Sequence, residues 1–404
     1  MITLKKNKIV LSITTFHTII FLFFLNLGYI GADWDSYALV GTAKLWIENN
    51  VYIPSRPPGF PAYELLVIGG IQLQDLINVP FEKIVLSIQY LFLIFTNFLI
   101  FKFFNYKSSQ SLIFYSVVVL SPIYIISAMS TIDYLLGTYF GFLAIYLATS
   151  SKNKKPLLII AILLSISISM RLSNLIFLFA LLTYMIVEKQ KFNEVIYVAL
   201  GTISISSIFY GYFYINLWEN MLSSIYGNNF SELLCIFNLT NTDHTLLDRL
   251  GRFVLKQANY VSLFGIFILI YNSSSLKQMI KKDNLIYLII FLSFQLSFLR
   301  LPTEEGHLLP SFIAFFILLS KTSREFKFKN TLLVLVLLSN FVNFNFYKVD
   351  QIDSASSVEI SLQLQRGQIL EDYQMRKERG QDKVFHYQNS VDTLLIAWKN
   401  GCPN

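Results

Sequence analysis

Long apolar runs, separated by short polar and basic segments, follow one another along most of the chain. A helix needs about 20 predominantly apolar residues to cross a bilayer. The pattern therefore predicts an all-α polytopic membrane protein with about eleven transmembrane helices. We place these helices at 9–29, 84–104, 111–128, 133–149, 156–170, 172–187, 195–215, 253–271, 284–299, 308–320 and 331–346.

Lysine and arginine gather in alternate gaps between these runs, at 5–8, 102–107, 152–155, 189–191, 277–282 and 321–329. Cytoplasmic loops of membrane proteins carry an excess of these two residues. We therefore place the N-terminus in the cytoplasm. The remaining gaps, and the C-terminus with them, are then external: 30–83, 129–132, around 171, 216–252, 300–307 and the tail from 347.

This alternation requires that the apolar run Phe60–Leu73 does not cross the membrane. The run is short, starts within RPPGFP, contains Glu64 and includes the pair Gly69–Gly70. Apolar runs of about 10 to 14 residues are more often interfacial or re-entrant than spanning. We predict a helix lying at the outer surface, inside one long external loop of residues 30–83.

The composition changes abruptly after the last apolar run. Residues 1–346 form the predicted transmembrane module, whereas 347–404 are mostly polar and suggest a small external tail with a candidate helix around 357–378.

Both cysteines, Cys235 and Cys402, fall on the predicted outside. An oxidising compartment permits a disulfide there, but two free thiols fit the sequence as well.

Composition agrees with a membrane protein. Of the 404 residues, 54% are hydrophobic and 14% charged, whereas soluble domains carry about 25% charged residues. The first run is too long for the core of a signal peptide, and no A-x-A cleavage site follows it, so we expect it to be retained. The net charge of +7 does not indicate nucleic acid, because the basic residues follow the topology.

The ionisable residues that could carry chemistry gather on the predicted outer face. The sequence has no zinc-type Cys/His spacing, no glycine-rich phosphate loop and no Ser/His/Asp arrangement. Ionisable groups near hydrocarbon are costly and are functional candidates by default. The candidates are Asp33, Asp35, Arg56, Asp133, Arg171, Arg300, Glu304, Glu305 and His307.

Carboxylates and arginines on one face suit one type of reaction. A carboxylate can take the proton of an attacking hydroxyl, while arginines bind a departing phosphate. If the electrophile is a sugar on a polyprenyl phosphate, the leaving group is already anionic and needs positive charge around it. Each of these residues also has a purely structural interpretation, which competes with the catalytic one. Asp33 and Asp35 would be the polar end of the first span, Asp133 would cap a helix, and Arg171 would extend its charged group to the interface.

Several segments, in order, resemble a known family. They are DWDSYALVGTAK, RPPGFPAY, LSPIYIISAMSTIDYLLGTYFGFLAIYLA, SMRLSNLIFLFALL and EEGHLLPSF. Their order and spacing are similar to those of class C membrane glycosyltransferases, in the branch of protein O-mannosyltransferases and the lipid A aminoarabinose transferase. The resemblance covers roughly the first 190 residues and 300–320. It implies a catalytic acid and surface-lying helices in the first external loop.

The resemblance also implies roles for single residues. The family's D-x-x-x-Y…A-[RK] spacing fits Asp35 when measured to Ala43–Lys44 and Asp33 when measured to Tyr37. We take Asp35 as the base and keep Asp33 as the alternative. Asp133 then matches a second-loop acid, and Arg171 matches a basic residue that contacts the donor phosphate.

One position departs from the family pattern. Relatives often have Arg-Tyr before the leucine–proline run, where this chain has Gly306 and His307. His307, Arg300 or neither could then bind phosphate. If Asp33, Asp35 and Asp133 converge, their oxygens suit magnesium or manganese, and the sequence leaves a metal open.

We therefore expect an inverting glycosyltransferase in the inner membrane of a bacterium. It would move a sugar from a polyprenyl-phosphate donor to a hydroxyl of a lipid, glycan or protein on the outer face. A transporter or flippase of lipid-linked sugars is the alternative from another class, although transporters usually place polar groups at mid-membrane on broken helices. A polymerase of the O-antigen type, which uses diphosphate-linked donors, is the third.

Overall fold

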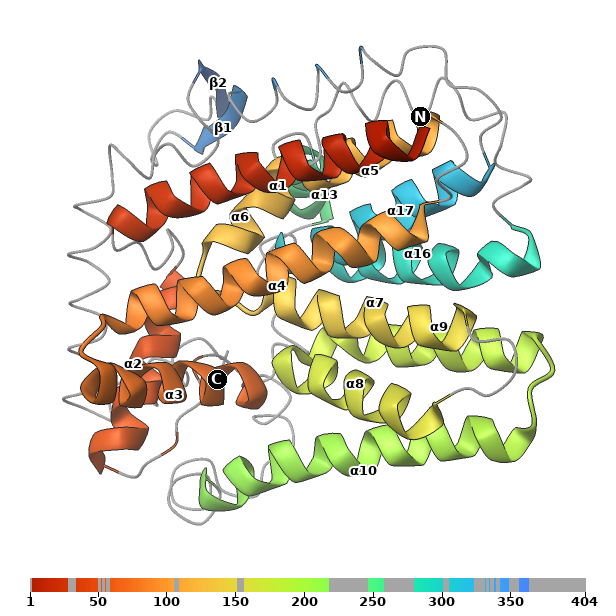
Figure 1. Cartoon of the computed structure of the whole chain (residues 1–404). Helices are drawn as coiled ribbons and strands as arrows, with labels where there is room; N and C mark the ends of the chain where they lie inside the picture. The colour runs from red at the N-terminus through yellow and green to blue at the C-terminus, as the bar shows by residue number, and fades with distance from the viewer. Residues whose placement is uncertain are drawn as a thin grey trace.

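The computed structural model describes a helical bundle with a small two-stranded sheet (Figure 1). The described residues are 2–27, 34–49, 52, 55, 59–104, 109–150, 156–217, 246–257, 280–300, 305–322, 331, 334, 338, 342–348 and 356–362. Ten helices form the described bundle: α1 (Ile2–Leu27), α4 (Phe81–Phe103), α5 (Ser109–Val119), α6 (Pro122–Met129), α7 (Tyr134–Ser150), α8 (Leu157–Met170), α9 (Leu175–Val187), α10 (Phe192–Leu217), α16 (Leu285–Arg300) and α17 (Leu308–Thr322).

The bundle has the apolar character of an integral membrane protein. Phe81–Phe103, Phe192–Tyr212 and Lys282–Arg300 are long and apolar enough to cross a membrane, and the bent pair α5–α6 would make a fourth such segment. Five other described helices are apolar but shorter. Large apolar side chains on the outside, such as Phe98 and Leu296, are exposed, as contact with lipid requires. The predicted count of eleven spans stays a prediction.

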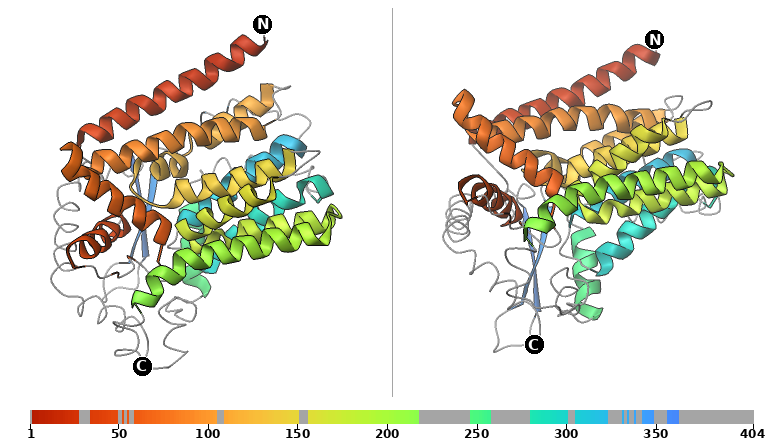
Figure 2. Two further views of the ribbon diagram at one scale, coloured as in Figure 1. Left: turned by 60° about the horizontal axis from the view of Figure 1, so that its bottom comes forward. Right: turned by 90° about the horizontal axis from the view of Figure 1, so that it is seen from below.

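Two further helices form most of the described part of the first predicted external loop. These are α2 (Trp34–Asn49) and α3 (Pro61–Ile77), which lie at one end of the bundle and are inclined to its long helices (Figure 2). Proline at the first position of α3 suits a helix start, where its missing N–H is not needed. α3 is not among the apolar helices that could span, in agreement with the surface helix predicted over Phe60–Leu73. Its side of the membrane stays a prediction.

The predicted span 111–128 is wrong as one continuous helix, because the chain bends by 57° between α5 and α6. Pro122 has no N–H to donate and ends the preceding helix. The carbonyls freed by the bend find other donors. Ser121 Oγ donates to Val118 O at 2.8 Å, and His17 Nε2 donates to Val119 O at 2.9 Å.

His17 is the centre of a buried polar network inside the bundle. Asn97 Nδ2 donates to His17 Nδ1 at 3.1 Å, which leaves the ring proton on Nε2 for the bond to Val119. Asn97 Oδ1 accepts the hydroxyl of Tyr124 at 2.6 Å. The network joins α1, α4 and α6 beside the bend.

The last predicted span, 331–346, is wrong at its end. Residues 342–346 belong to strand β1 (Val342–Lys348), which pairs antiparallel with β2 (Ser356–Leu362). The candidate helix at 357–378 is wrong at its start for the same reason. Both segments alternate apolar and polar residues with the period of two that strands favour. The register brings Phe344 opposite Ile360, whereas hydropathy averaged over a window conceals this alternation.

The predicted span 253–271 also begins differently. Its first residues belong to helix α13 (Leu246–Gln257), which starts earlier and carries charged residues along its length. The remainder of that span, from residue 258 onward, lies outside the described residues.

Candidate active site

A buried ion pair joins two of the predicted site residues. Arg171 Nη1 donates to Asp133 Oδ2 at 2.8 Å, and the two side chains are 6% and 0% exposed. Each residue stands at a helix end: Asp133 before the start of α7 and Arg171 after the end of α8. Asp133 directly precedes α7, and its carbonyl accepts the N–H of Gly137. Arg171 is an extended residue between α8 and the short turn Leu172–Asn174. The helix ends therefore place opposite charges in contact.

Two aromatic rings enclose the guanidinium of Arg171. Its Cζ lies 4.7 Å from the ring centroid of Tyr134 and 5.8 Å from that of Phe60. The negative face of an aromatic ring attracts a cation, and more so where water is excluded. Phe60 directly precedes α3, so the first predicted external loop contributes directly to the surroundings of Arg171.

Gln89 of α4 fixes the position of this cluster along the bundle. Its Nε2 donates to Ile132 O at 2.7 Å and to the hydroxyl of Tyr63 at 2.6 Å. Gln89 lies eight residues after the first residue of α4, which corresponds to about 12 Å along a helix. The turn before Asp133 therefore lies beside the interior of α4, about 12 Å from the start of that helix.

Tyr63 belongs to the same cluster. Burial raises the pKa of its hydroxyl well above the ordinary value, the bond from Gln89 opposes that rise, and the negative charge of Asp133 adds to it. Tyr63 therefore keeps its proton at every physiological pH.

The segment before α17 also contacts this cluster, in addition to the starts of α3 and α7 and the end of α8. A Cβ on Gly306 would lie 2.6 Å from ring atoms of Tyr134 and 2.8 Å from Cζ of Arg171. His307 is buried, and its ring lies 6.0 Å from that of Phe294. The glycine at this position thus has a physical reason, because the backbone comes too close to Arg171 for any side chain.

We expect Gly306→Ala to shift Arg171 or Tyr134, because a methyl group at that distance overlaps both. Overpacking a filled site typically costs about 1–3 kcal/mol. The measurement is the unfolding midpoint of the detergent-purified protein. Gly69→Ala is the matched control, since nothing lies within 4 Å of its Cβ and alanine suits a helix interior better by about 0.5–1 kcal/mol. Equal midpoints for the two variants would show that the space at Gly306 is not tight.

A second buried carboxylate shapes the loop in front of α3. Glu64 is fully buried and accepts hydrogen bonds from the hydroxyl of Tyr52, from the N–H and hydroxyl of Ser55 at 2.8 and 2.7 Å, and from the N–H of Phe60 at 3.3 Å. These bonds hold the segment before α3 against the helix. They also fix Phe60, which contacts Arg171.

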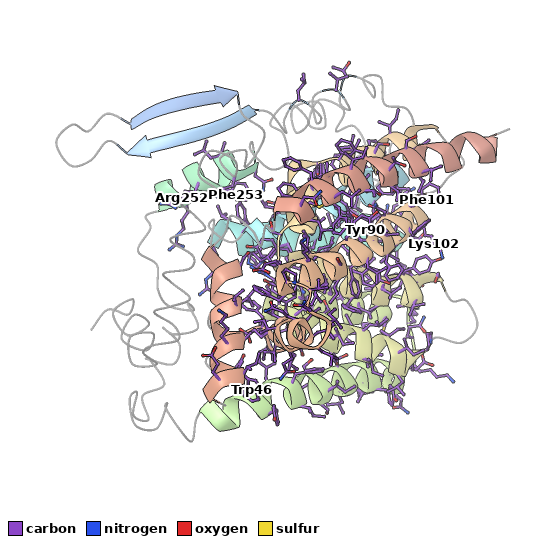
Figure 3. The ribbon with its side chains drawn as sticks, turned by 60° about the vertical axis from the view of Figure 1, so that its left-hand side comes forward. Trp46, Tyr90, Phe101, Lys102, Arg252 and Phe253 are labelled. Atoms are coloured by element: carbon purple, nitrogen blue, oxygen red, sulfur yellow. The ribbon has the colours of Figure 1, made fainter. Side chains whose placement is uncertain are left out.

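Trp46 ties α2 to the same loop. Its ring lies 6.1 Å from that of Tyr52 and 6.3 Å from that of Tyr212 in α10, and Figure 3 shows it at the end of the bundle. The helix that carries Asp35 is therefore connected to Glu64 through Tyr52 and to the bundle through Tyr212.

The stability of the protein should depend on pH through Glu64. Burial raises the pKa of its carboxyl above the ordinary value of 4.5, and the bonds from Tyr52, Ser55 and Phe60 oppose that rise. The folded chain then binds this proton more tightly than the unfolded chain. The contribution of Glu64 to folding is complete below pH 4.5 and is lost as the pH rises through the folded pKa.

We therefore expect Glu64→Gln, a neutral mimic of the protonated acid, to flatten this pH dependence while keeping the loop folded. Glu64→Ala should instead lose about 3 kcal/mol or more, because several buried donors are left without a partner. Unfolding midpoints measured from about pH 4 to about pH 8, a range that starts near the ordinary value of 4.5 and extends above it, compare the two variants. An unchanged slope in Glu64→Gln would show that this carboxyl does not titrate in the folded protein.

The structure brings together some of the predicted site residues and leaves others untested. Asp133 and Arg171 are in contact, and Gly306 links them to His307. Arg300 ends α16 and is exposed. Asp35 stands in the first turn of α2, but its side chain lies outside the described part, as do Asp33, Arg56, Glu304 and the side chain of Glu305.

Sequence reasoning missed Tyr63, Gln89 and Tyr134 as members of the cluster. Gln89 had a detectable signal, since it is a polar residue inside an apolar run. Within the described residues, no three His, Cys, Asp or Glu side chains lie close enough together to hold a metal ion. The prediction of magnesium or manganese at Asp35 and Asp133 therefore rests on the sequence alone.

Comparison with solved structures finds a similar fold. The crystal structure of ArnT from Cupriavidus metallidurans in the apo state matches with a TM-score of 0.51 and 12% identity, over 76% of this chain and 59% of the ArnT chain. The chain thus spans about three fifths of the length of that protein. No protein-family model matches, and no curated protein matches by sequence. ArnT is a lipid A aminoarabinose transferase of the class C glycosyltransferase fold, so the predicted class C fold is supported, and the branch within it stays a prediction.

Proposed function

We propose that this protein is an inverting membrane glycosyltransferase that takes a sugar from a polyprenyl-phosphate donor. The observation that carries the proposal is the arginine of the Asp133–Arg171 pair, held in a buried setting between the start of α7 and the end of α8. A cation at that position suits a phosphate at the membrane surface. The similarity of the fold to that of ArnT supports the same reaction class.

The proposed reaction is a single displacement at the anomeric carbon. A hydroxyl oxygen of the acceptor forms the new glycosidic bond while the bond from the sugar to the phosphate oxygen breaks with its electron pair. The proton of the acceptor passes to Asp35, or to Asp33 as the alternative, acting as general base. The polyprenyl phosphate leaves as an anion, and no proton donor is needed for it.

Arg171 would stabilise the departing phosphate. Asp133 orients its guanidinium, while Tyr134 and Phe60 exclude water and so strengthen the attraction. Arg56, Arg300, Glu304 and His307 are proposed to bind substrate around this centre. If a magnesium or manganese ion takes part, Asp35 and Asp133 would hold it and it would add positive charge at the phosphate.

The acceptor is proposed to be a hydroxyl of a lipid, glycan or protein on the outer face of a bacterial inner membrane. This placement follows from the basic clusters of the sequence, which assign the N-terminus to the cytoplasm and the site to the opposite face. The lipid part of the donor stays in the bilayer, and its phosphate then lies at the level of the headgroups.

The proposal is tested by donor turnover with the detergent-purified full chain. The probes are undecaprenyl-monophosphate mannose, undecaprenyl-monophosphate glucose and an undecaprenyl-diphosphate oligosaccharide, with a membrane extract supplying acceptors. We expect undecaprenyl phosphate to be released from a monophosphate donor. Turnover of the diphosphate donor alone would indicate a polymerase. No turnover in detergent, with movement of donor across vesicles, would indicate a transporter; either result overturns the proposal.

A further inference from the structure

Helix α13 separates apolar from basic residues along its length. Leucine, phenylalanine and valine recur at intervals of three and four on one side, whereas three basic residues and one acid fall elsewhere. The apolar side carries Leu246, Leu247, Leu250, Phe253 and Val254, and the charged positions are Asp248, Arg249, Arg252 and Lys256; Leu255 is the one leucine outside the apolar side. This pattern is typical of a helix that lies in the plane of a membrane interface.

α13 is attached to the end of a candidate membrane span. The ring of Phe253 lies 5.6 Å from that of Phe298, and Gln257 Nε2 donates to Gln295 Oε1 at 2.5 Å. Both partners belong to the last two turns of α16, within the candidate span Lys282–Arg300. Beside this end of α16, helix α13 runs across the direction of the bundle helices (Figures 1 and 2).

The exposed surface of α13 is apolar on one flank of the helix and basic on the other. Leu250 is 42% exposed and Val254 55% exposed, one helical turn apart. Arg252 is exposed between them in sequence. Figure 3 shows Arg252 on the outer side of α13 and Phe253 on the side toward the bundle. Exposed apolar residues on one flank of a helix and an exposed cation on the other, at the end of a membrane span, match the boundary between headgroups and acyl chains.

We propose that α13 lies in the headgroup layer and binds anionic phospholipid. Leu250 and Val254 contact the first carbons of the acyl chains, and Arg252 contacts lipid phosphate. The surplus of basic residues on α13 favours an anionic lipid over a zwitterionic one. It also disfavours a second copy of this chain as the occupant, because two basic helices would repel each other. The inference is independent of the proposed transferase activity.

The depth of α13 is tested with a spin label in the full chain. In a background with Cys235→Ser and Cys402→Ser, Leu250→Cys carries a nitroxide in vesicles of phosphatidylcholine with added phosphatidylglycerol. We expect relaxation by oxygen to exceed relaxation by a water-soluble nickel chelate, with a depth of about 5–10 Å. Labels at Leu292→Cys, which is exposed on the lipid side of α16, and at Lys189→Cys, in the turn after α9, serve as hydrocarbon and water references.

The lipid preference is tested by charge reversal. Phosphatidylglycerol and phosphatidylcholine are titrated separately into the labelled, detergent-purified protein, and the mobility of the label at 250 gives two apparent affinities. We expect Arg252→Glu to reduce the preference for phosphatidylglycerol by about fivefold or more. Lys191→Glu, an exposed position directly before α10, should leave it unchanged. Leu250 and Arg252 are both exposed, so both variants should fold, which circular dichroism can check.

Two results would overturn the proposal. A label at 250 that behaves like the water reference in both kinds of vesicle would show that α13 stands clear of the membrane. A label shielded from both relaxing agents would show that protein, such as a second copy or a partner, covers this face instead of lipid.

Discussion

Alanine in place of Arg171 is expected to reduce transfer by about a hundredfold or more and to destabilise the protein by about 3–5 kcal/mol. The loss of stability follows because Asp133, which is 0% exposed, would keep a buried negative charge without its partner. The loss of transfer follows because a preorganised donor to a developing anion typically contributes a factor of about 10²–10³. Unfolding midpoints and donor turnover measure the two effects.

A double variant separates the two effects of Arg171. Asp133→Leu with Arg171→Met removes both charges, and apolar replacement of a buried ion pair is often neutral or stabilising. We expect this variant to recover most of the stability lost in Arg171→Ala and none of the transfer. Recovery of both would show that the ion pair is structural only and that phosphate binds elsewhere.

Asparagine in place of Asp35 is expected to lower transfer by about 10²–10⁴, the range that a general base contributes. The amide keeps the size of the side chain but cannot accept the proton of the acceptor hydroxyl. Asp35 stands in the first turn of α2, where loss of a negative charge costs only about 0.3–1 kcal/mol, so we expect little change in stability. Release of undecaprenyl phosphate under single-turnover conditions is the measurement.

Asp33→Asn is the matched control for Asp35→Asn. If Asp35 is the base, Asp33→Asn should retain most of the activity, and the opposite result would assign the base to Asp33. Full activity in both variants would contradict a catalytic role for the first external loop. The assignment of Arg171 would still stand in that case, because it is tested by its own variants.

The parts of this molecule that could be predicted from sequence are those that depend on local pattern. Asp133 and Arg171 were selected because charges at the ends of apolar runs are costly, and the structure pairs them. The bend at Pro122 had a local signal, but the average hydropathy around it is that of a continuous span. The alternation of apolar and polar residues in strand β1 is visible only residue by residue, because an average over a window conceals it.

The remainder depended on contacts between distant segments. Gln89 stands out as a polar residue inside an apolar run, but nothing local shows that it bonds to Ile132, far away in the sequence. Glu64 was visible as an acid in a short apolar run, but its donors lie in a loop without regular structure. The close approach of Gly306 to Arg171 could not be foreseen either, because a glycine gives no sign of which neighbour requires its small size.

The pairing of Asp133 with Arg171 also has a consequence for biosynthesis. The two residues flank the hairpin of α7 and α8, so they can meet as soon as this hairpin leaves the ribosome, and their two charges can enter the bilayer already paired. Gly306 is synthesised roughly ten seconds later, at about 5–20 residues per second. The segment before α17 must then dock onto an arginine that is already in place, and a residue without a side chain makes that late step possible.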